Sequence, residues 1–183
     1  MSRTIRQAEP TDMASIMQVM AAAKRIMRSS GNMHQWTGNY PSESVILGDM
    51  AREGAYVVTD DDVVVAYFAF LPSPDPTYAH IYDGAWLDDS LPYHVIHRMA
   101  SYPQVHHIFT DVMNHCFSTD PNIRMDTHRD NTIMQHLITT YGFSYCGIIY
   151  LANGDERKAY QKIQITSEDL LTGQKPLTEV RQG

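Results

Sequence analysis

The order of apolar patterns along the chain limits its fold more than any other feature of the sequence. Alternating or continuous apolar runs typical of strands occur at residues 3–9, 55–59, 63–70, 93–100, 122–128, 143–151 and 158–163. Apolar residues at helical spacing occur at 12–27, 42–54, 110–117 and 131–142. The resulting order is β, α, α, β, β, β, α, β, α, β, β. Strands that alternate singly and in pairs with helices predict an α/β fold, with a mixed sheet covered by helices.

Short polar side chains mark the expected helix ends. Thr11 or Asp12 is expected to cap the first helix, and Thr110 or Asp111 the third, because their oxygens can accept free backbone N–H groups. Gly142 is expected to end the last helix, since glycine adopts the left-handed conformation found after helix C-termini.

The length and composition predict one well-packed domain over residues 1–163, followed by a polar C-terminal tail at 164–183. No apolar run approaches the roughly 20 residues that a membrane helix needs, and the first residues lack the apolar core of a signal peptide. The chain has only two cysteines, Cys116 and Cys146, which fits the reducing cytoplasm best.

The charge pattern bears on partners. The net charge is −7 and basic residues form no stripe, which argues against nucleic acid and is compatible with an amine ligand. The tail could pack on a second copy of the chain in a homodimer.

Histidine is concentrated in the middle of the chain, but the spacing does not predict a metal site. Six of the nine histidines lie between His94 and His128. His94 and His97 are three apart on one expected strand and so point to opposite faces. Adjacent His106 and His107 are poorly placed to bind one ion, and no HExxH or Cys/His zinc spacing occurs. Structural or surface roles are favoured, and we expect no metal.

Four segments of the chain resemble the GNAT superfamily of N-acetyltransferases. The segment NIRMDTHRDNTIMQHLITTYGFSYCGIIYLANGDERKAYQKI, residues 122–163, looks like the fifth strand, fourth helix and last two strands of a bacterial subgroup. HQWTGNYPS (34–42), IYDGAWL (81–87) and YHVIHRMAS (93–101) are also typical of that subgroup. The resemblance implies a mostly antiparallel sheet of about seven strands with helices on both faces. It also implies that the fourth and fifth strands splay apart, and that an acetyl group passes from acetyl-CoA to an amine of a small molecule or peptide.

The resemblance also implies positions for the cofactor. The pantetheine arm would lie along the fourth strand at His97 and Met99. The pyrophosphate would rest on backbone N–H groups at the start of the third helix, near His106 and Thr110, where the helix dipole favours an anion. Asn131, at the start of the fourth helix, would contact the cofactor arm or serve only as a helix cap.

Three positions depart from the family pattern. Phe109 and Asp111 occupy the two positions where the pyrophosphate loop has small residues. A ring and a carboxylate there are expected to weaken phosphate binding, because glycine lets the backbone approach the phosphate closely. Ile138 occupies the position of the tyrosine that donates a proton to the leaving thiolate. Tyr141 is a weak substitute for it, because it lies three residues further on.

The acceptor side is expected to involve residues from two connections. His34 and Trp36 lie between the first two helices, and Trp36 could be either a lid or a packing residue. Asp83 and Trp86 lie in the long connection before the fourth strand. Asp83 could hold or deprotonate an ammonium group, although a solvated loop carboxylate is the default interpretation.

Two functions remain open on the sequence. The first is a working N-acetyltransferase, which the fourth strand and Asn131 favour. The second is a degenerate relative with weak or no CoA binding that acts as a ligand-binding or protein-interaction module, which Phe109, Asp111 and Ile138 favour. We favour the first hypothesis.

Overall fold

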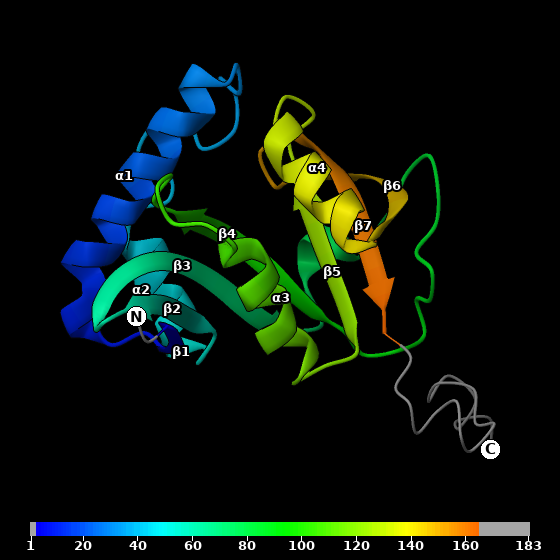
Figure 1. The fold of residues 1–183 in the computed structure, drawn as a ribbon. Helices are drawn as coiled ribbons and strands as arrows, with labels where there is room; N and C mark the ends of the chain where they lie inside the picture. Colours follow the sequence, from blue (N-terminus) through cyan, green and yellow to red (C-terminus); the bar gives the residue numbers. More distant parts are fainter. Residues whose placement is uncertain (1–2, 165–183) are drawn as a thin grey trace.

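The computed structural model describes residues 3–164, which form a seven-stranded sheet with four α-helices in the predicted order (Figure 1). The elements are β1 (Arg3–Gln7), α1 (Met13–Ser29), α2 (Glu43–Ala51), β2 (Ala55–Asp60), β3 (Val63–Pro72), β4 (His94–Ser101), α3 (Ile108–Phe117), β5 (Asn122–Thr127), α4 (Thr132–Tyr141), β6 (Ser144–Tyr150) and β7 (Glu156–Ile163). The predicted fold class is therefore confirmed. Apart from Gln164, the predicted tail lies outside the described residues. Within residues 3–164, no helix has the length and apolar character needed to cross a bilayer.

The strands are ordered β1-β2-β3-β4-β5-β7-β6. Neighbouring strands are antiparallel except β4 and β5, which are parallel. The parallel pair aligns only three residues of each strand, from His94 opposite Ile123 to Ile96 opposite Met125. Beyond this point the two strands separate toward their C-terminal ends, as Figure 1 shows. The predicted splay is present.

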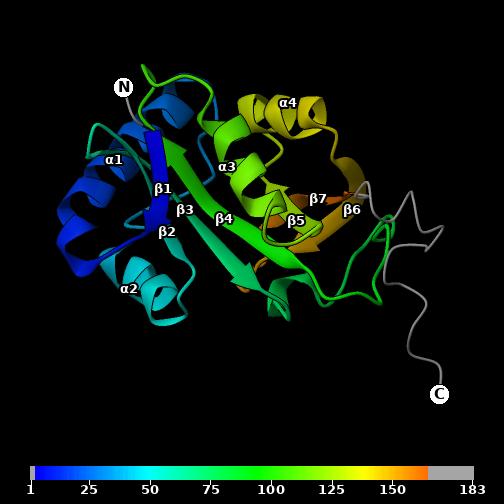
Figure 2. The same cartoon turned by 60° about the horizontal axis from the view of Figure 1, so that its bottom comes forward.

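The helices cover both faces of the sheet (Figure 2). Val57 packs with α1 and α2 on one face, whereas the adjacent Val58 packs with α3 and α4 on the other, as the two-residue period of a strand requires. Farther along the first face, the connection between β3 and β4 takes the place of a helix. Its Tyr78 and Trp86 pack on Val95, Ile149 and Ala159 of the sheet.

The expected helix caps were only partly correct. α3 begins at Ile108 with His107 at its N-cap, so Thr110 and Asp111 lie inside the first turn and do not cap it. Asp12 precedes α1, but its carboxylate accepts hydrogen bonds from Arg6 and from the Glu9 backbone instead of from the helix. Gly142 ends α4 at φ 100°, as predicted.

A bulge in β4 lies where the strand leaves β5. Tyr67 pairs with Ala100 and Ala69 with His97, so β4 has one residue more than β3 in this interval. Arg98 within it has φ 54°. Its guanidinium forms an ion pair with Asp49 of α2, and Asp49 also accepts a hydrogen bond of 2.7 Å from Tyr67. The Arg98 and Asp49 side chains are only 13% and 5% exposed, so each depends on the other for neutralisation.

We expect Asp49→Asn to destabilise the protein by about 3–5 kcal/mol, because it leaves the Arg98 charge buried without an anion. Urea unfolding at pH 7 measures the loss. Glu43→Gln, at the exposed start of the same helix, is the control and should cost below about 1 kcal/mol. Equal losses for the two variants would contradict the role given to the pair.

Candidate active site

Two cavities meet where β4 and β5 separate. The first, of about 240 Å³, is lined by polar side chains from β4, β5, β7 and the β3–β4 connection. The second, of about 520 Å³, lies among α1, the end of β4, and the N-termini of α3 and α4. Met27, Met99, Asn131 and Met134 line both cavities. A molecule lying in the gap would therefore reach from one cavity to the other.

The N-terminus of α3 opens into the second cavity. Ile108, Phe109 and Thr110 line this cavity, and the first hydrogen bond of the helix runs from Asp111 N to His107 O. The backbone N–H groups of the first three helical residues precede this bond, and no side chain caps them. Free N–H groups together with the helix dipole favour an anion at this position.

The two residues expected to obstruct phosphate binding are placed differently from the expectation. The Phe109 side chain belongs to the core, with its ring 6.0 Å from that of Tyr141 in edge-on contact, and the residue is only 8% exposed. Asp111 does not line the cavity, and its carboxylate forms a 2.6 Å ion pair with Arg3 of β1. Phe109 still lines the second cavity, so the expected weakening of phosphate binding stays a prediction.

Asn131 joins α4 to the loop between α1 and α2. Its side-chain oxygen accepts from Met134 N at 3.1 Å, so it caps α4. Its amide nitrogen donates to Gln35 Oε1 at 2.9 Å, and Asn32 donates to the same oxygen at 2.9 Å. The cap interpretation is confirmed, whereas contact with a cofactor stays a prediction. Because Asn131 and Gln35 both line the first cavity, this network fixes the boundary between the two cavities.

The first cavity contains a cluster of ionisable side chains around His97. His97 Nε2 lies 2.8 Å from Asp75 Oδ2, and its Nδ1 lies 3.8 Å from Asp126 Oδ1. The buried Tyr78 hydroxyl donates to Asp126 Oδ1 at 2.6 Å. With the Nε2 proton held by Asp75, Nδ1 is the ring nitrogen that can exchange a proton on the side of Asp126. His97, expected beside the cofactor arm, thus lines the polar cavity and not the second one.

Burial and hydrogen bonding set the charges of this cluster. Burial raises the pKa of Asp75, but the His97 hydrogen bond and charge and the Thr77 backbone N–H outweigh it, and the pKa falls to about 2. Burial, and then the Asp126 charge, raise the pKa of Tyr78 well above its ordinary value. Asp75 is therefore a carboxylate at neutral pH, and Tyr78 remains a hydrogen-bond donor.

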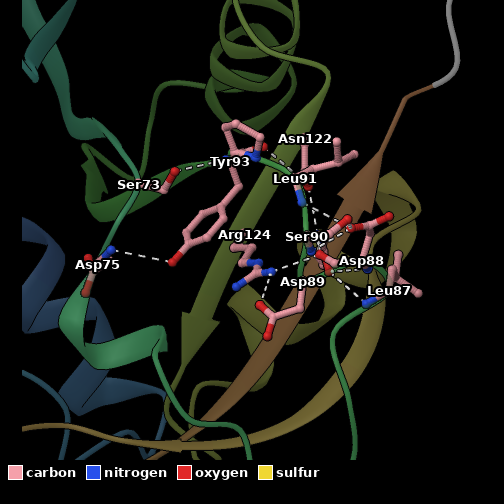
Figure 3. Close-up of polar contacts among 12 residues, drawn as sticks. Ser73, Asp75, Leu87, Asp88, Asp89, Ser90, Leu91, Tyr93, Asn122 and Arg124 are labelled. Atoms are coloured by element: carbon pink, nitrogen blue, oxygen red, sulfur yellow. Dashed lines mark hydrogen bonds and ion pairs between the residues drawn. The ribbon is translucent and has the colours of Figure 1, made fainter. Parts of the chain in front are cut away.

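A buried arginine holds the β3–β4 connection that carries Asp75 and Tyr78 (Figure 3). The Arg124 guanidinium lies 4.0 Å from the centre of the Trp86 ring and 3.8 Å from that of Tyr93. It also donates to Asp88 O and to Asp89 Oδ1, both at 2.9 Å. Cation–π contacts of this kind are strongest when desolvated, and Arg124 is fully buried.

The same connection approaches β6 through two glycines. Tyr82 exchanges both backbone hydrogen bonds with Ile148 at 2.8 Å. A Cβ on Gly84 would lie 2.0 Å from Cys146 O, and one on Gly147 would lie 2.5 Å from Tyr82 O. Both positions therefore require glycine. Tyr82 and Gly84 belong to the segment IYDGAWL (81–87), and Gly147 and Ile148 belong to CGIIY (146–150).

The remaining predicted residues divide between the site and other places. Trp36 lines the first cavity, while His106 and Thr110 line the second. Trp86 and Tyr141 line neither: the first packs on Arg124, and the Tyr141 hydroxyl donates to Asn114. Asp83 and His34 are exposed and also line neither cavity.

Sequence reasoning missed Asp75, Asp126 and Arg157. The available signal was the alternation that places Asp126 on the face of β5 opposite the apolar Met125. Among residues 3–164, no group of three or more His, Cys, Asp or Glu side chains could hold a metal ion.

Comparison with known proteins identifies the family. No family model matches the chain, and no curated protein does. A GNAT family acetyltransferase from Streptococcus agalactiae is 30% identical and overlays with a TM-score of 0.82, covering 90% of this chain and 96% of that chain. This chain belongs to the GNAT family of acetyltransferases.

More distant structures share the fold. A GNAT family acetyltransferase from Listeria monocytogenes is 19% identical with a TM-score of 0.65, covering 88% of this chain and 94% of that one. The ribosomal-protein-S18-alanine N-acetyltransferase from Escherichia coli is 12% identical with a TM-score of 0.59, and the match covers 92% of this chain and 98% of that one. At these identities the likeness concerns the GNAT fold alone.

The depressed pKa of Asp75 predicts a pH dependence of stability. A carboxyl group whose pKa is lower in the folded state stabilises it above the unfolded-state pKa of about 3.9, and this contribution is lost as pH falls toward 2. At 1.36 kcal/mol per pKa unit, the contribution at pH 7 is about 2–3 kcal/mol. We expect Asp75→Asn to lose that amount at pH 7 and to show a smaller further loss between pH 4 and pH 2.

Urea unfolding at a series of pH values measures this effect. Asp83→Asn removes an exposed loop carboxylate from the same connection and should keep the wild-type profile. An Asp75→Asn profile parallel to that of the wild type would show that the His97–Asp75 pair does not contribute this stability.

Proposed function

We propose that the chain is an N-acetyltransferase that transfers the acetyl group of acetyl-CoA to a primary amine of a small molecule or peptide. One observation carries the proposal: the separated ends of β4 and β5 join a cavity that contains a free helix N-terminus to a cavity that contains a histidine and two carboxylates. An anionic cofactor fits the cavity at the helix N-terminus (the second cavity), and an amine fits the cavity around His97 (the first cavity).

The donor side fits a CoA molecule without the usual glycines. The N–H groups of Ile108, Phe109 and Thr110 would supply a phosphate site, with the Phe109 ring packed against Tyr141 and the Asp111 carboxylate paired with Arg3. The second cavity extends from there past Met134 and Leu137 to Met99 at the gap. Past Ile96 the edge of β4 that faces the gap pairs with no strand among residues 3–164, so its backbone can hydrogen-bond an extended arm. When bound, acetyl-CoA would supply the reactive thioester.

The acceptor side fits proton removal from an ammonium group. Asp126 attracts the cation, and Tyr78 orients its carboxylate. His97 Nδ1, made a proton acceptor by the Asp75 contact at Nε2, faces the same place and can take the proton that must leave before the amine attacks. Holding amine and thioester together at the gap contributes a large part of the acceleration.

The missing tyrosine is compatible with this chemistry. Ile138 is fully buried in the core and can donate no proton. However, an ordinary thiol has a pKa near 8.5, so its thiolate is a good leaving group that solvent can protonate. Loss of that donor is therefore expected to slow transfer rather than abolish it.

Calorimetry with acetyl-CoA, followed by an assay of thiol release with a panel of amines, tests the proposal. We expect saturable binding and amine-dependent release of CoA. Absence of binding at millimolar acetyl-CoA would favour the alternative, a degenerate member that acts as a ligand-binding or protein-interaction module.

Thr110→Glu separates cofactor binding from folding. Thr110 is exposed, lies in the first turn of α3 and lines the second cavity. An acidic residue there stabilises the helix by about 0.3–1 kcal/mol but repels a pyrophosphate. We expect the Kd for CoA to rise about tenfold or more with no loss of thermal stability. Thr140→Glu, exposed and outside both cavities, should leave the Kd unchanged. Equal Kd values for the two variants would argue against phosphate binding at α3.

A further inference from the structure

The first cavity is lined by charged side chains of both signs, and some of them have a close partner of opposite charge whereas others do not. Arg98 is committed to Asp49, and Asp75 to His97 and the Thr77 N–H. Asp126, Arg157 and Arg52 remain, and of the two arginines only Arg157 is buried, whereas Arg52 is exposed. Of the two Asp126 oxygens, only Oδ1 has a partner among residues 3–164, so Oδ2 is available to a ligand.

Arg157 is a buried arginine in the wall of the first cavity, and no anion binds it closely among residues 3–164. The residue is only 5% exposed. Its Nη1 donates to the neighbouring Glu156 O at 2.8 Å, and its Nη2 lies 3.8 Å from the half-exposed carboxylate of Asp155. A guanidinium withdrawn from water normally has a closely bound anion, because burying an unpaired charge is costly. Among residues 3–164, the one carboxylate within 4 Å of this guanidinium is that of Asp155, at the limit of an ion pair.

The register of the sheet brings Asp126 and Arg157 to the same place. Asp126 of β5 is directly opposite Ala159 of β7, and Arg157 is two residues from Ala159. Directly opposite residues and residues two apart share a face, so Asp126 and Arg157 are diagonal neighbours. Such neighbours lie about 7–8 Å apart, within reach of one small molecule. Both line the first cavity.

We infer that the acceptor is a small zwitterion, an amino acid whose ammonium group binds Asp126 and whose carboxylate binds Arg157. This inference rests on the proposed acetyl transfer. A polyamine would leave the Arg157 charge unpaired and repelled. An internal peptide segment or a lysine side chain would bring no carboxylate. The volume of about 240 Å³ is below the roughly 300–1,000 Å³ of typical drug-sized pockets, which favours a compact acceptor.

The test compares acids with their amides. The protein amino acids, β-alanine and 4-aminobutyrate are each assayed beside the matching carboxamide, with release of CoA thiol as the readout. For the best amino acid, we expect kcat/KM at least tenfold above that of its carboxamide. Arg157→Gln should bring this ratio close to one, mainly by raising KM for the acid, and Arg157→Lys should restore part of it.

Arg129→Gln is the matched control. Arg129 is exposed and lines neither cavity, so the variant removes the same charge nearby and should keep the wild-type ratio. Melting temperatures of all variants, and their Kd for CoA, establish that each is folded and binds the cofactor.

The outcomes separate the two proposals. Turnover of carboxamides or polyamines as good as that of the amino acids would overturn the zwitterion and leave acetyl transfer intact. A ratio that falls equally in Arg157→Gln and Arg129→Gln would overturn the role of Arg157. If the protein binds CoA but acetylates no amine of the panel, both the acetyl transfer to small amines and the acceptor class inferred from it are wrong.

Discussion

The short pairing of β4 with β5 is the constraint on which the rest of the site depends. Three residue pairs join the strands, and then the backbone of β4 turns away through the bulge at Arg98. A bulge increases local twist and bends a strand, but it needs support when a non-glycine residue takes φ 54°. Asp49 supplies that support from the adjacent helix through the Arg98 guanidinium. The gap, the free edge of β4 and both cavities follow from this one divergence.

The acceptor side depends on a different kind of support. The β3–β4 connection covers this part of the sheet in place of a helix, and strand side chains bind its backbone. Gln161 accepts from Leu87 N at 2.8 Å, and Asn122 donates to Pro92 O at 3.0 Å. Arg124 adds a cation between two aromatic rings, although its Nε and Nη1 have no hydrogen-bond partner in the described part of the chain. The ring contacts offset part of that desolvation. Through Tyr93, whose hydroxyl accepts from Asp75 N, this cluster is linked to the position of the acidic residue beside His97.

The sequence predicted the order of the elements because each strand and helix has its own apolar period. It predicted both ends of α4 but not the N-terminal caps of α1 and α3. The Asp12 carboxylate pairs with Arg6, and His107 is the residue at the N-cap of α3. Nor could it identify Asp75 and Asp126 as partners of His97. That contact depends on the long β3–β4 connection folding back across the sheet. The local spacing of apolar residues gives no information about such a long-range contact. Nor could the motif position alone show where the Phe109 and Asp111 side chains point, because packing in the core and the ion pair with Arg3 decide that. Their expected weakening of phosphate binding stays a prediction.

A phosphate site without glycine is physically consistent with this geometry. Glycine in such a loop serves two purposes, a left-handed backbone turn and the close approach of backbone N–H groups to an anion. Here His107 takes the left-handed turn at φ 66°, a conformation that histidine adopts more readily than most residues. The close approach needs the side chains of the first helical turn to point elsewhere. The Ile108 and Phe109 side chains pack in the core, although both residues also line the cavity together with Thr110. In the proposed phosphate site, the left-handed His107 would thus replace one function of the glycines, and burial of the neighbouring side chains would replace the other.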